Sequence, residues 1–305
     1  MITERDLRSH AGERLPGGRV LIEPYADWLL RDVVRAPADP GGLAHPAAAF
    51  LLATEGLGIG LEELFARFGA SSRDGPMLGE WAVDTLEPLR PGRAYQAAAE
   101  VTGAVRKSGS RAGIFDLVSV TVTLAAEDGR PHAVVRPVYV FPRRTASPGA
   151  GPGTGPGGRA GGAAGRPAPK GDPLPPLTIE AVDPEKMKIM AALLRDPNPI
   201  HFDPAAARAA GLGDGTVNQG PVTIAYVQNM LASWAGGEDR IGALSLRLTA
   251  NVLSGDRVAA GGRVVGAGSG SGAECAVWLD VTARAGEPLA PPLRALSGTA
   301  KVALA

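Results

Sequence analysis

The chain has 305 residues, enough for two ordinary domains or one large one with a substantial core. Its 31 Lys and Arg residues balance its 31 Asp and Glu residues, so no broad electrostatic field exists to bind a nucleic acid or a membrane surface. One cysteine, Cys275, excludes an internal disulfide framework and indicates a reducing compartment, the cytoplasm, and we expect neither a targeting segment nor a transmembrane helix.

The first half of the chain predicts one helix followed by four strands. Residues 46–68 predict the helix. They begin with Pro46, which is favourable at the first position of a helix, and carry apolar residues at helical spacing. Gly56, Gly58 and Gly60 interrupt this helix, and they predict either a kink that opens space beside it or a break between two short helices. Strand-like stretches separated by turn residues follow at 81–86, 94–105, 113–124 and 132–141.

Residues 145–172 separate the two halves. Fifteen of these 28 residues are Gly or Pro, and no aromatic or β-branched run is present to be buried. Such a segment cannot offset its own ordering entropy, so we expect a flexible linker. The predicted organisation is an N-terminal domain at 1–144, the linker at 145–172 and a C-terminal domain at 173–305.

The second half repeats the order of the first. A helix is predicted at 221–234, between an initial proline and a pair of glycines. Four strand-like stretches follow it, at 241–252, 257–267, 273–284 and 293–304. Gly92 and Gly255 occupy matching places in the two halves. We therefore predict an α+β fold of two units, each a long helix wrapped by an antiparallel sheet, joined into one pseudo-symmetric body.

The segment Asp196-Pro-Asn-Pro-Ile-His201 is the strongest candidate for chemistry. Its two prolines exclude a regular helix, and neither a helix nor a strand would aim Asp196 and His201 at one point. A turn can fold the carboxylate back towards the imidazole, giving a general acid/base pair that one water can bridge. The alternative is an Asx-turn that caps the next helix, with His201 as an ordinary exposed side chain.

A metal site is not expected. His201-Phe202-Asp203 is similar to the His-x-Asp pair of iron oxygenases, but that site needs a second histidine downstream and none follows His201. Four histidines and one cysteine also make a zinc site hard to assemble. We predict no metal and no cofactor.

The stretch DPNPIHFDPAAARAAG from Asp196, with QGPVTIAYVQNML after it, resembles the signature of MaoC-like dehydratases, the (R)-specific or type-2 enoyl-CoA hydratases. The resemblance implies that Asp196 and His201 are catalytic and that the amide of Gly220 forms an oxyanion hole at the start of a central helix. It also implies a hot dog fold, here in its tandem (double) form. Only the second half carries the complete motif, so the first half is expected to be non-catalytic.

The activity implied by the resemblance is a hydro-lyase reaction of fatty acid metabolism. A trans-2-enoyl thioester would be hydrated reversibly to the (R)-3-hydroxyacyl thioester. The carrier can be CoA or acyl-carrier protein, and the division of roles between Asp196 and His201 stays open. A homodimer is compatible with this reading.

Two supporting residues accompany the motif, and two other functions compete. Asn198 is expected to shape the turn, and Gln219 stands where many members of the family have histidine. Because of this exchange, an alternative function stays open, that of a non-catalytic hot dog protein that binds acyl thioesters or completes the site of another subunit. A hot dog thioesterase would need an acid on the helix at 221–234, which contains none. His45, before Pro46, is expected to sit where Gly220 does and to act as a cap.

Overall fold

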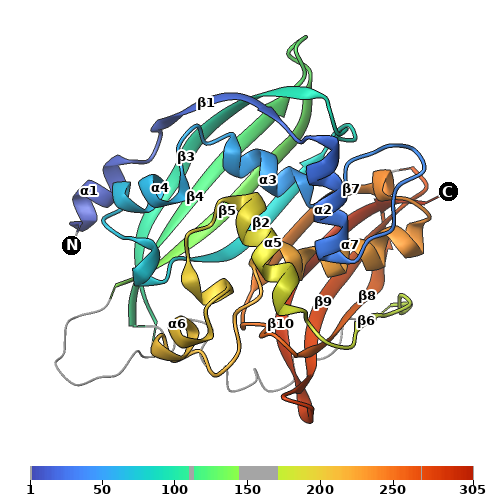
Figure 1. The fold of residues 1–305 in the computed structure, drawn as a ribbon. Helices are drawn as coiled ribbons and strands as arrows, with labels where there is room; N and C mark the ends of the chain where they lie inside the picture. Colours follow the sequence, from blue (N-terminus) through green and yellow to red (C-terminus); the bar gives the residue numbers. More distant parts are fainter. Residues whose placement is uncertain (1, 110–112, 144–170, 269, 305) are drawn as a thin grey trace.

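One continuous antiparallel sheet forms the body of the computed structural model, which describes residues 2–109, 113–143, 171–268 and 270–304 (Figure 1). The strand order is β1-β3-β4-β5-β2-β7-β10-β9-β8-β6. The strands of the first half are β1 (Arg14–Leu21), β2 (Met77–Thr85), β3 (Ala94–Gly109), β4 (Gly113–Ala125) and β5 (Pro131–Arg143). Those of the second half are β6 (Leu177–Ile179), β7 (Ile241–Leu248), β8 (Arg257–Ala267), β9 (Gly272–Arg284) and β10 (Glu287–Ala303).

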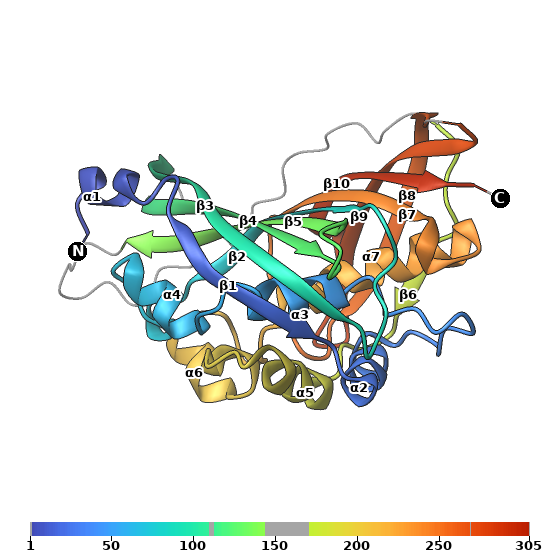
Figure 2. The same cartoon turned by 90° about the horizontal axis from the view of Figure 1, so that it is seen from above.

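The helices form two layers on one side of the sheet (Figure 2). The α-helices are α1 (Glu4–Ser9), α2 (Pro24–Val34), α3 (Ala48–Glu55), α4 (Leu61–Arg67), α5 (Pro184–Leu194), α6 (Pro204–Ala209) and α7 (Gly220–Ala235). Short 3-10 helices are η1 (Ser72–Asp74), η2 (Pro199–His201) and η3 (Glu238–Arg240). Helices α3 and α7 pack on the strands, and α2 and α5 pack on each other outside them. The predicted α+β fold is confirmed.

The two halves have the same strand order on either side of the β2–β7 pairing and are related by a pseudo-twofold axis there. Gly92 and Gly255 occupy equivalent turns, with φ angles of 75° and 79°. The amide of Gly92 donates to Ile22 (2.9 Å), and that of Gly255 donates to Val182 (2.8 Å). Each of these carbonyls precedes an outer helix that begins with proline, α2 or α5. The repeat therefore starts with β1–α2 and β6–α5, elements that the sequence analysis missed.

The expectation of one long helix in each half is wrong for the first half. Helix α7 is continuous over 16 residues, but residues 56–60 separate α3 from α4. Gly58 has a φ of 72°, and a β-carbon there would lie 2.4 Å from the carbonyl oxygen of Gly17 in β1. Of the two expected outcomes, the break between short helices is the one found, and β1 packing against Gly58 fixes it. All eight predicted strands are confirmed, although β10 begins earlier than predicted.

Residues 145–170 of the predicted linker lie outside the described part of the chain. Its last two residues are described, and the carbonyls of Gly171 and Asp172 accept hydrogen bonds from Arg263 and Val264 of β8. The flexibility of the linker stays a prediction.

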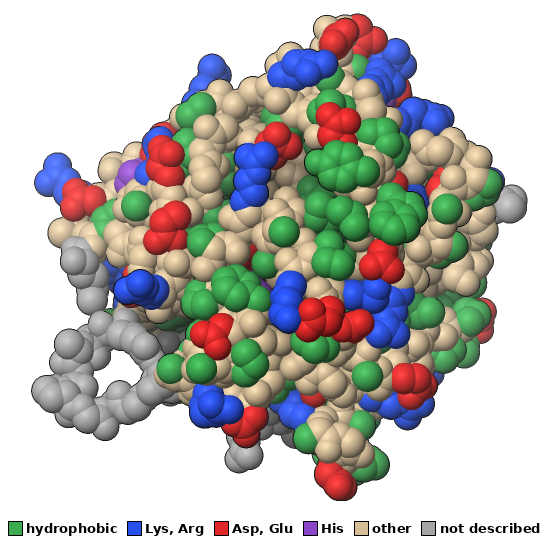
Figure 3. All heavy atoms as spheres, viewed as in Figure 1, with side chains coloured by type: hydrophobic (Ala, Val, Ile, Leu, Met, Phe, Trp, Pro, Cys, Tyr) green, Lys and Arg blue, Asp and Glu red, His purple; other side chains and the backbone are tan. Residues whose placement is uncertain are grey.

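The surface carries charges of both signs, interspersed over the face seen in Figure 3. This pattern agrees with the formal net charge of zero. Within the described ranges, no helix is both long and apolar enough to cross a membrane.

A buried ion network joins the two halves beside α2. Arg31 of α2 contacts Asp27 on the same helix (3.0 Å) and both carboxylate oxygens of Glu238 in η3 (2.8 Å each). The side chains of Arg31 and Asp27 are each 7% exposed, and that of Glu238 is 13% exposed. Arg31 also donates to the carbonyls of Pro37 and Leu43, so its guanidinium is fully used. Each charge in this network has a partner, as burial requires.

Replacing Arg31 by Met should lower the free energy of unfolding by about 3–5 kcal/mol, because two buried carboxylates lose their cation. Urea denaturation measures this loss. The matched control is Arg130→Met, since Arg130 also pairs with carboxylates but its side chain is 60% exposed. That change should cost no more than about 1 kcal/mol. Equal losses in the two variants would contradict a structural role for the network.

Candidate active site

A cavity of about 150 Å³ lies where the two halves meet beside the N-terminus of α7. A volume of this order admits a benzene-sized ligand. The first half contributes mainly apolar side chains, among them Phe50, Leu61, Phe65, Met77, Leu78 and Tyr139. The second half contributes all five predicted site residues, Asp196, Asn198, His201, Gln219 and Gly220. The structure thus brings the whole predicted site together and shows which side chains of the first half line it.

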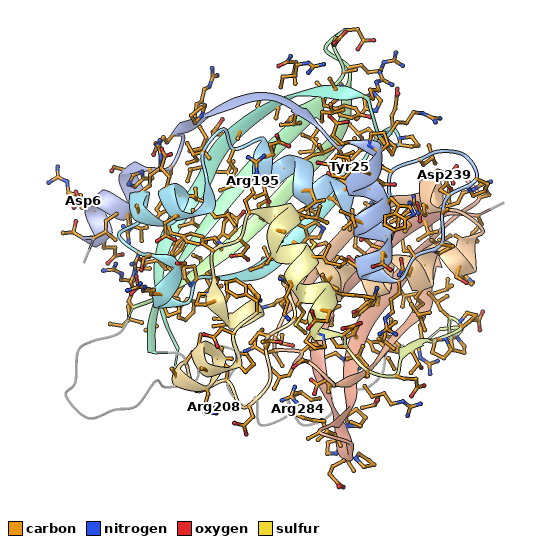
Figure 4. All side chains as sticks on the ribbon, viewed as in Figure 1. Asp6, Tyr25, Arg195, Arg208, Asp239 and Arg284 are labelled. Atoms are coloured by element: carbon orange, nitrogen blue, oxygen red, sulfur yellow. The ribbon has the colours of Figure 1, made fainter. Side chains whose placement is uncertain are left out.

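Asp196 follows the end of α5, where Arg195 adopts a left-handed conformation (φ 51°) and turns the chain. Figure 4 labels Arg195 at this end of α5. One carboxylate oxygen of Asp196, Oδ1, accepts a hydrogen bond from the backbone amide of Asn198 (3.0 Å). The expected Asx-turn is therefore present. It leaves the other oxygen, Oδ2, free to face His201.

His201 ends η2, which begins at Pro199, and its ring lies against the next loop. Nδ1 is 2.7 Å from the carbonyl oxygen of Val217. Because a carbonyl only accepts, Nδ1 carries the proton, and Nε2 of the neutral ring is an acceptor. Nε2 lies 3.4 Å from Oδ2 of Asp196, with the two side chains 12% and 14% exposed. The Asx-turn of one alternative is therefore present, but His201 is not an exposed side chain, and the carboxylate and imidazole face each other as the other alternative requires.

One water molecule can bridge the two groups from the side of the cavity, because atoms 3.4 Å apart leave no room for a water directly between them. At 3.4 Å the contact is longer than a good direct hydrogen bond. A carboxylate and a histidine nitrogen without a proton are both acceptors, so a donor placed beside them can bond to both. A water molecule supplies two such donors. The arrangement is suited to general acid/base chemistry on water.

Asn198 holds the turn rather than the carboxylate. Its side chain is buried, and its Oδ1 accepts from the amide of Ile200 (3.4 Å) as the N-cap of η2. Only its backbone amide reaches Asp196. The role predicted for Asn198 in shaping the turn agrees with these contacts.

Gly220 is the first residue of α7, and Gln219 is its N-cap. Among the described residues, none accepts a hydrogen bond from the amide of Gly220. A β-carbon at Gly220 would lie 3.0 Å from Leu78 Cδ2 and 3.2 Å from Leu248 Cδ2, so glycine fits this narrow place. The free amide and the positive end of the α7 dipole therefore face a cavity that could hold a negatively charged oxygen.

Gln219 links the N-terminus of α7 to α5. Its side chain is buried, and its Nε2 donates to the carbonyl oxygen of Met187 in α5 (2.8 Å). This bond ties the N-terminus of α7 to the helix that ends at Asp196. Nε2 fills the supporting role considered for Gln219, whereas Oε1 is buried without a hydrogen-bond partner among the described residues at the cavity lining, so the substrate-binding role stays open.

The first half contains a structurally equivalent place at the end of α2, which we call the residual site. Arg35 ends α2 in the same left-handed conformation (φ 58°) as Arg195 ends α5. The next amides, of Ala36 and Asp196, make matching bonds of 2.9 Å to Arg31 and Ala191. Alanine therefore occupies the place of the catalytic candidate. The Arg-Ala-Pro and Arg-Asp-Pro triplets at 35–37 and 195–197 are the sequence signal of this equivalence.

His45 lies at the residual site and corresponds to Gln219, not to Gly220 as expected from the sequence. The amides of Ala44 and Asn218, one residue earlier, bind the equivalent carbonyls of Leu89 (2.9 Å) and Val252 (2.8 Å). Nε2 of His45 lies 2.8 Å from Asn229 Oδ1, and Nδ1 accepts from the amide of Ala47 (3.1 Å). A cavity of only about 20 Å³ is left there, next to Glu238. The expectation that His45 caps the helix is wrong, because the N-cap of α3 is Ala47, and the His45 ring accepts only from the amide of that N-cap residue.

Acidification should destabilise the protein through His45. Burial, more than any other cause, lowers the pKa of His45 from 6.5 to about 4. The unfolded chain then binds more protons than the folded one between these values, so stability present at pH 7 is lost as the pH falls from 6.5 towards 4. At pH 5 the loss should be about 2 kcal/mol.

The measurement is urea denaturation of the natural protein and of His45→Gln at pH 7 and pH 5. The variant, which lacks the titrating ring, should lose about 2 kcal/mol less than the natural protein. Identical pH dependence in both proteins would show that His45 does not couple folding to protonation.

Similar folds are found in several solved structures. A MaoC-like dehydratase has a TM-score of 0.71 at 16% identity, with 97% of this chain and 99% of that chain covered. A MaoC-like dehydratase from Phytophthora capsici has a TM-score of 0.68 at 15% identity, covering 99% and 98%. A Mycobacterium tuberculosis protein described as having a double hotdog fold has a TM-score of 0.60 at 18% identity, covering 96% of each chain. This chain is a double hot dog protein.

The family of the second half follows from its sequence. Residues 166–283 match the family described as the MaoC like domain. This match covers less than half of the chain, and it confirms the resemblance of the segment from Asp196 onward to MaoC-like proteins. A comparison with curated protein sequences found no match.

Proposed function

We propose that this protein is a hydro-lyase that adds water to a trans-2-enoyl thioester, or removes it from the (R)-3-hydroxyacyl thioester. The observation that carries the proposal is the facing of Asp196 Oδ2 and His201 Nε2, 3.4 Å apart, at a cavity that also receives the start of α7. The MaoC-like domain of the second half supports the same reaction class.

In the hydration direction, the Asp196/His201 pair holds the attacking water. As its oxygen bonds to the β-carbon of the enoyl group, the water loses one proton to the pair. A proton from the pair is then delivered to the α-carbon, so the protein ends the cycle with the protons it started with. Since Nδ1 of His201 donates to Val217, only Nε2 of this ring can exchange a proton with water or substrate.

Charge develops on the thioester oxygen during this addition. The enolate-like state places negative charge there, and the amide of Gly220 at the α7 N-terminus is the donor that can receive it. Removing one such donor from an enzyme typically costs about 3–4 kcal/mol of transition-state stabilisation. The positive end of the helix dipole acts in the same direction.

The first half supplies the wall for the acyl chain. Its side chains at the cavity are almost all apolar, and the equivalent of Asp196 in this half is Ala36. One active site per chain follows from this asymmetry. The cavity of about 150 Å³ admits a short acyl group, carried by CoA or by acyl-carrier protein.

The second candidate function is a non-catalytic protein that binds acyl thioesters. Gln219, in place of histidine, is the observation behind it, but the side chain of Gln219 bonds to Met187 and lies outside the acid/base geometry. A thioesterase is disfavoured because α7 carries no acidic residue. The deciding experiment follows the absorbance of the conjugated thioester in a series of enoyl-CoA and enoyl-carrier-protein substrates. Binding without loss of absorbance would favour the non-catalytic function.

Asp196→Asn and His201→Ala should each lower kcat by at least about a hundredfold, because each removes one half of the proton-transferring pair. The double variant should be little worse than the worse single variant, since both residues act on one water. Steady-state hydration of crotonyl-CoA gives these values, with circular dichroism as the check that the fold is intact. Near-normal turnover in either single variant would remove the mechanism.

Leu61→Ala should extend the accepted acyl chain, because Leu61 is a half-buried side chain at the cavity wall. We expect kcat/KM for an eight-carbon enoyl-CoA to rise about tenfold relative to that for crotonyl-CoA. Ile59→Ala is the matched control, since Ile59 is also half-buried and packs on the core but does not line the cavity. An equal shift in both variants would contradict the assignment of the wall.

A further inference from the structure

Tyr139 brings a hydroxyl from the first half into the cavity. It lies in β5, directly opposite Leu78 of β2, and Leu78 is the side chain packed against Gly220. Tyr139 shares the inner face of β5 with Phe141, two residues on, which packs against Phe65 of α4. Tyr139 is only 6% exposed, and the exposed remainder lines the cavity together with Asp196 and His201.

This hydroxyl has no hydrogen-bond partner among the described residues. The hydroxyl is not among the fully buried side-chain atoms that lack a partner, so it is reachable from the cavity, and a ligand there can supply an acceptor. Burial, followed by the nearby carboxylate of Asp196, raises the pKa of Tyr139 well above its usual value. The phenol therefore stays protonated and acts as a donor at neutral pH.

Two oxygens of a bound enoyl or hydroxyacyl thioester could accept this bond. The thioester oxygen is directed to the amide of Gly220, whereas the β-oxygen lies with Asp196 and His201. Tyr139 lines the cavity together with both members of the Asp196/His201 pair, and this shared lining favours the β-oxygen. Asp196 is also, after burial, the group that raises the pKa of the phenol. A β-hydroxyl has one O–H and two lone pairs, so it can donate to the Asp196 carboxylate while it accepts from a phenol.

We propose that Tyr139 is a substrate-binding residue whose O–H donates a hydrogen bond to the oxygen that is added to, or removed from, the β-carbon. The proposal rests on the proposed hydratase function and adds to it a polar group from the half without the motif. Tyr139 then fixes the water or β-hydroxyl on the side away from the Asp196/His201 pair. The ligand it recognises is a thioester with a hydroxyl at carbon 3, rather than a saturated acyl thioester.

The test is a binding measurement that needs no turnover. Calorimetric titration with (R)-3-hydroxybutyryl-CoA and with butyryl-CoA is carried out on the natural protein, Tyr139→Phe and Tyr226→Phe. Tyr226 is the matched control, because it is buried in α7 but does not line the cavity. Tyr139→Phe should bind the hydroxy ester about five- to tenfold more weakly and butyryl-CoA within about twofold of the natural protein. Tyr226→Phe should leave the preference between the two thioesters unchanged.

Other outcomes overturn the inference in distinguishable ways. If Tyr139→Phe weakens both thioesters equally, or keeps the full preference for the hydroxy ester, Tyr139 does not bind the β-oxygen, while the proposed function stands. If the natural protein binds neither thioester, the proposed function fails and the role of Tyr139 fails with it. If Tyr139→Phe does not fold, its hydroxyl has a partner within the protein, which also contradicts the proposal.

Discussion

The pairing of β2 with β7 is the interaction on which the candidate site depends. It runs from Glu80–Arg247 to Asp84–Ala243 and joins two hot dog units into one sheet. Beyond the Glu80–Arg247 pair, Leu78 and Leu248 lie on either side of Gly220 instead of pairing with each other. The cavity opens at this point, so the seam that holds the halves together also sets the distance between the acyl wall and the acid/base pair.

The same seam has two ends, and the Asp-Pro-Asn-Pro-Ile-His motif lies at only one of them. At the other end, the place of Asp196 is taken by Ala36, and the residual cavity is bordered by Glu238, which Arg31 holds through two hydrogen bonds. A buried ion pair adds little net stability compared with apolar packing, but its geometry is specific. We infer that this end, through Arg31 and Glu238, fixes how the two halves pack on each other. It thereby fixes the geometry at the end that carries the motif.

The sequence predicted most of the sheet and the local part of the site. Strand alternation and turn residues marked eight strands, and the Asp-Pro-Asn-Pro turn is a local structure that needs no distant contact. The short strand β1 was missed because Pro16, Gly17 and Gly18 weaken its pattern, and its place is secured by contact with Gly58. Helices α2 and α5 were missed because the predicted repeat began at the central helix of each half, after both of them.

The individual side chains that line the cavity from the first half, Tyr139 among them, could not be predicted. Their place at the cavity depends on how β5 pairs with β2 and β2 with β7. In the sequence Tyr139 is an ordinary inward-facing strand residue between Pro137 and Phe141. It becomes a candidate site residue only because β5 pairs with β2 so that Leu78 is its direct neighbour, and because β2 pairs with β7. The proposed acid/base pair is thus built by one short turn, whereas the groups proposed to select the substrate come from strands and helices of the other half. Substitutions in the first half can therefore alter substrate selection without disturbing the turn that holds Asp196 and His201.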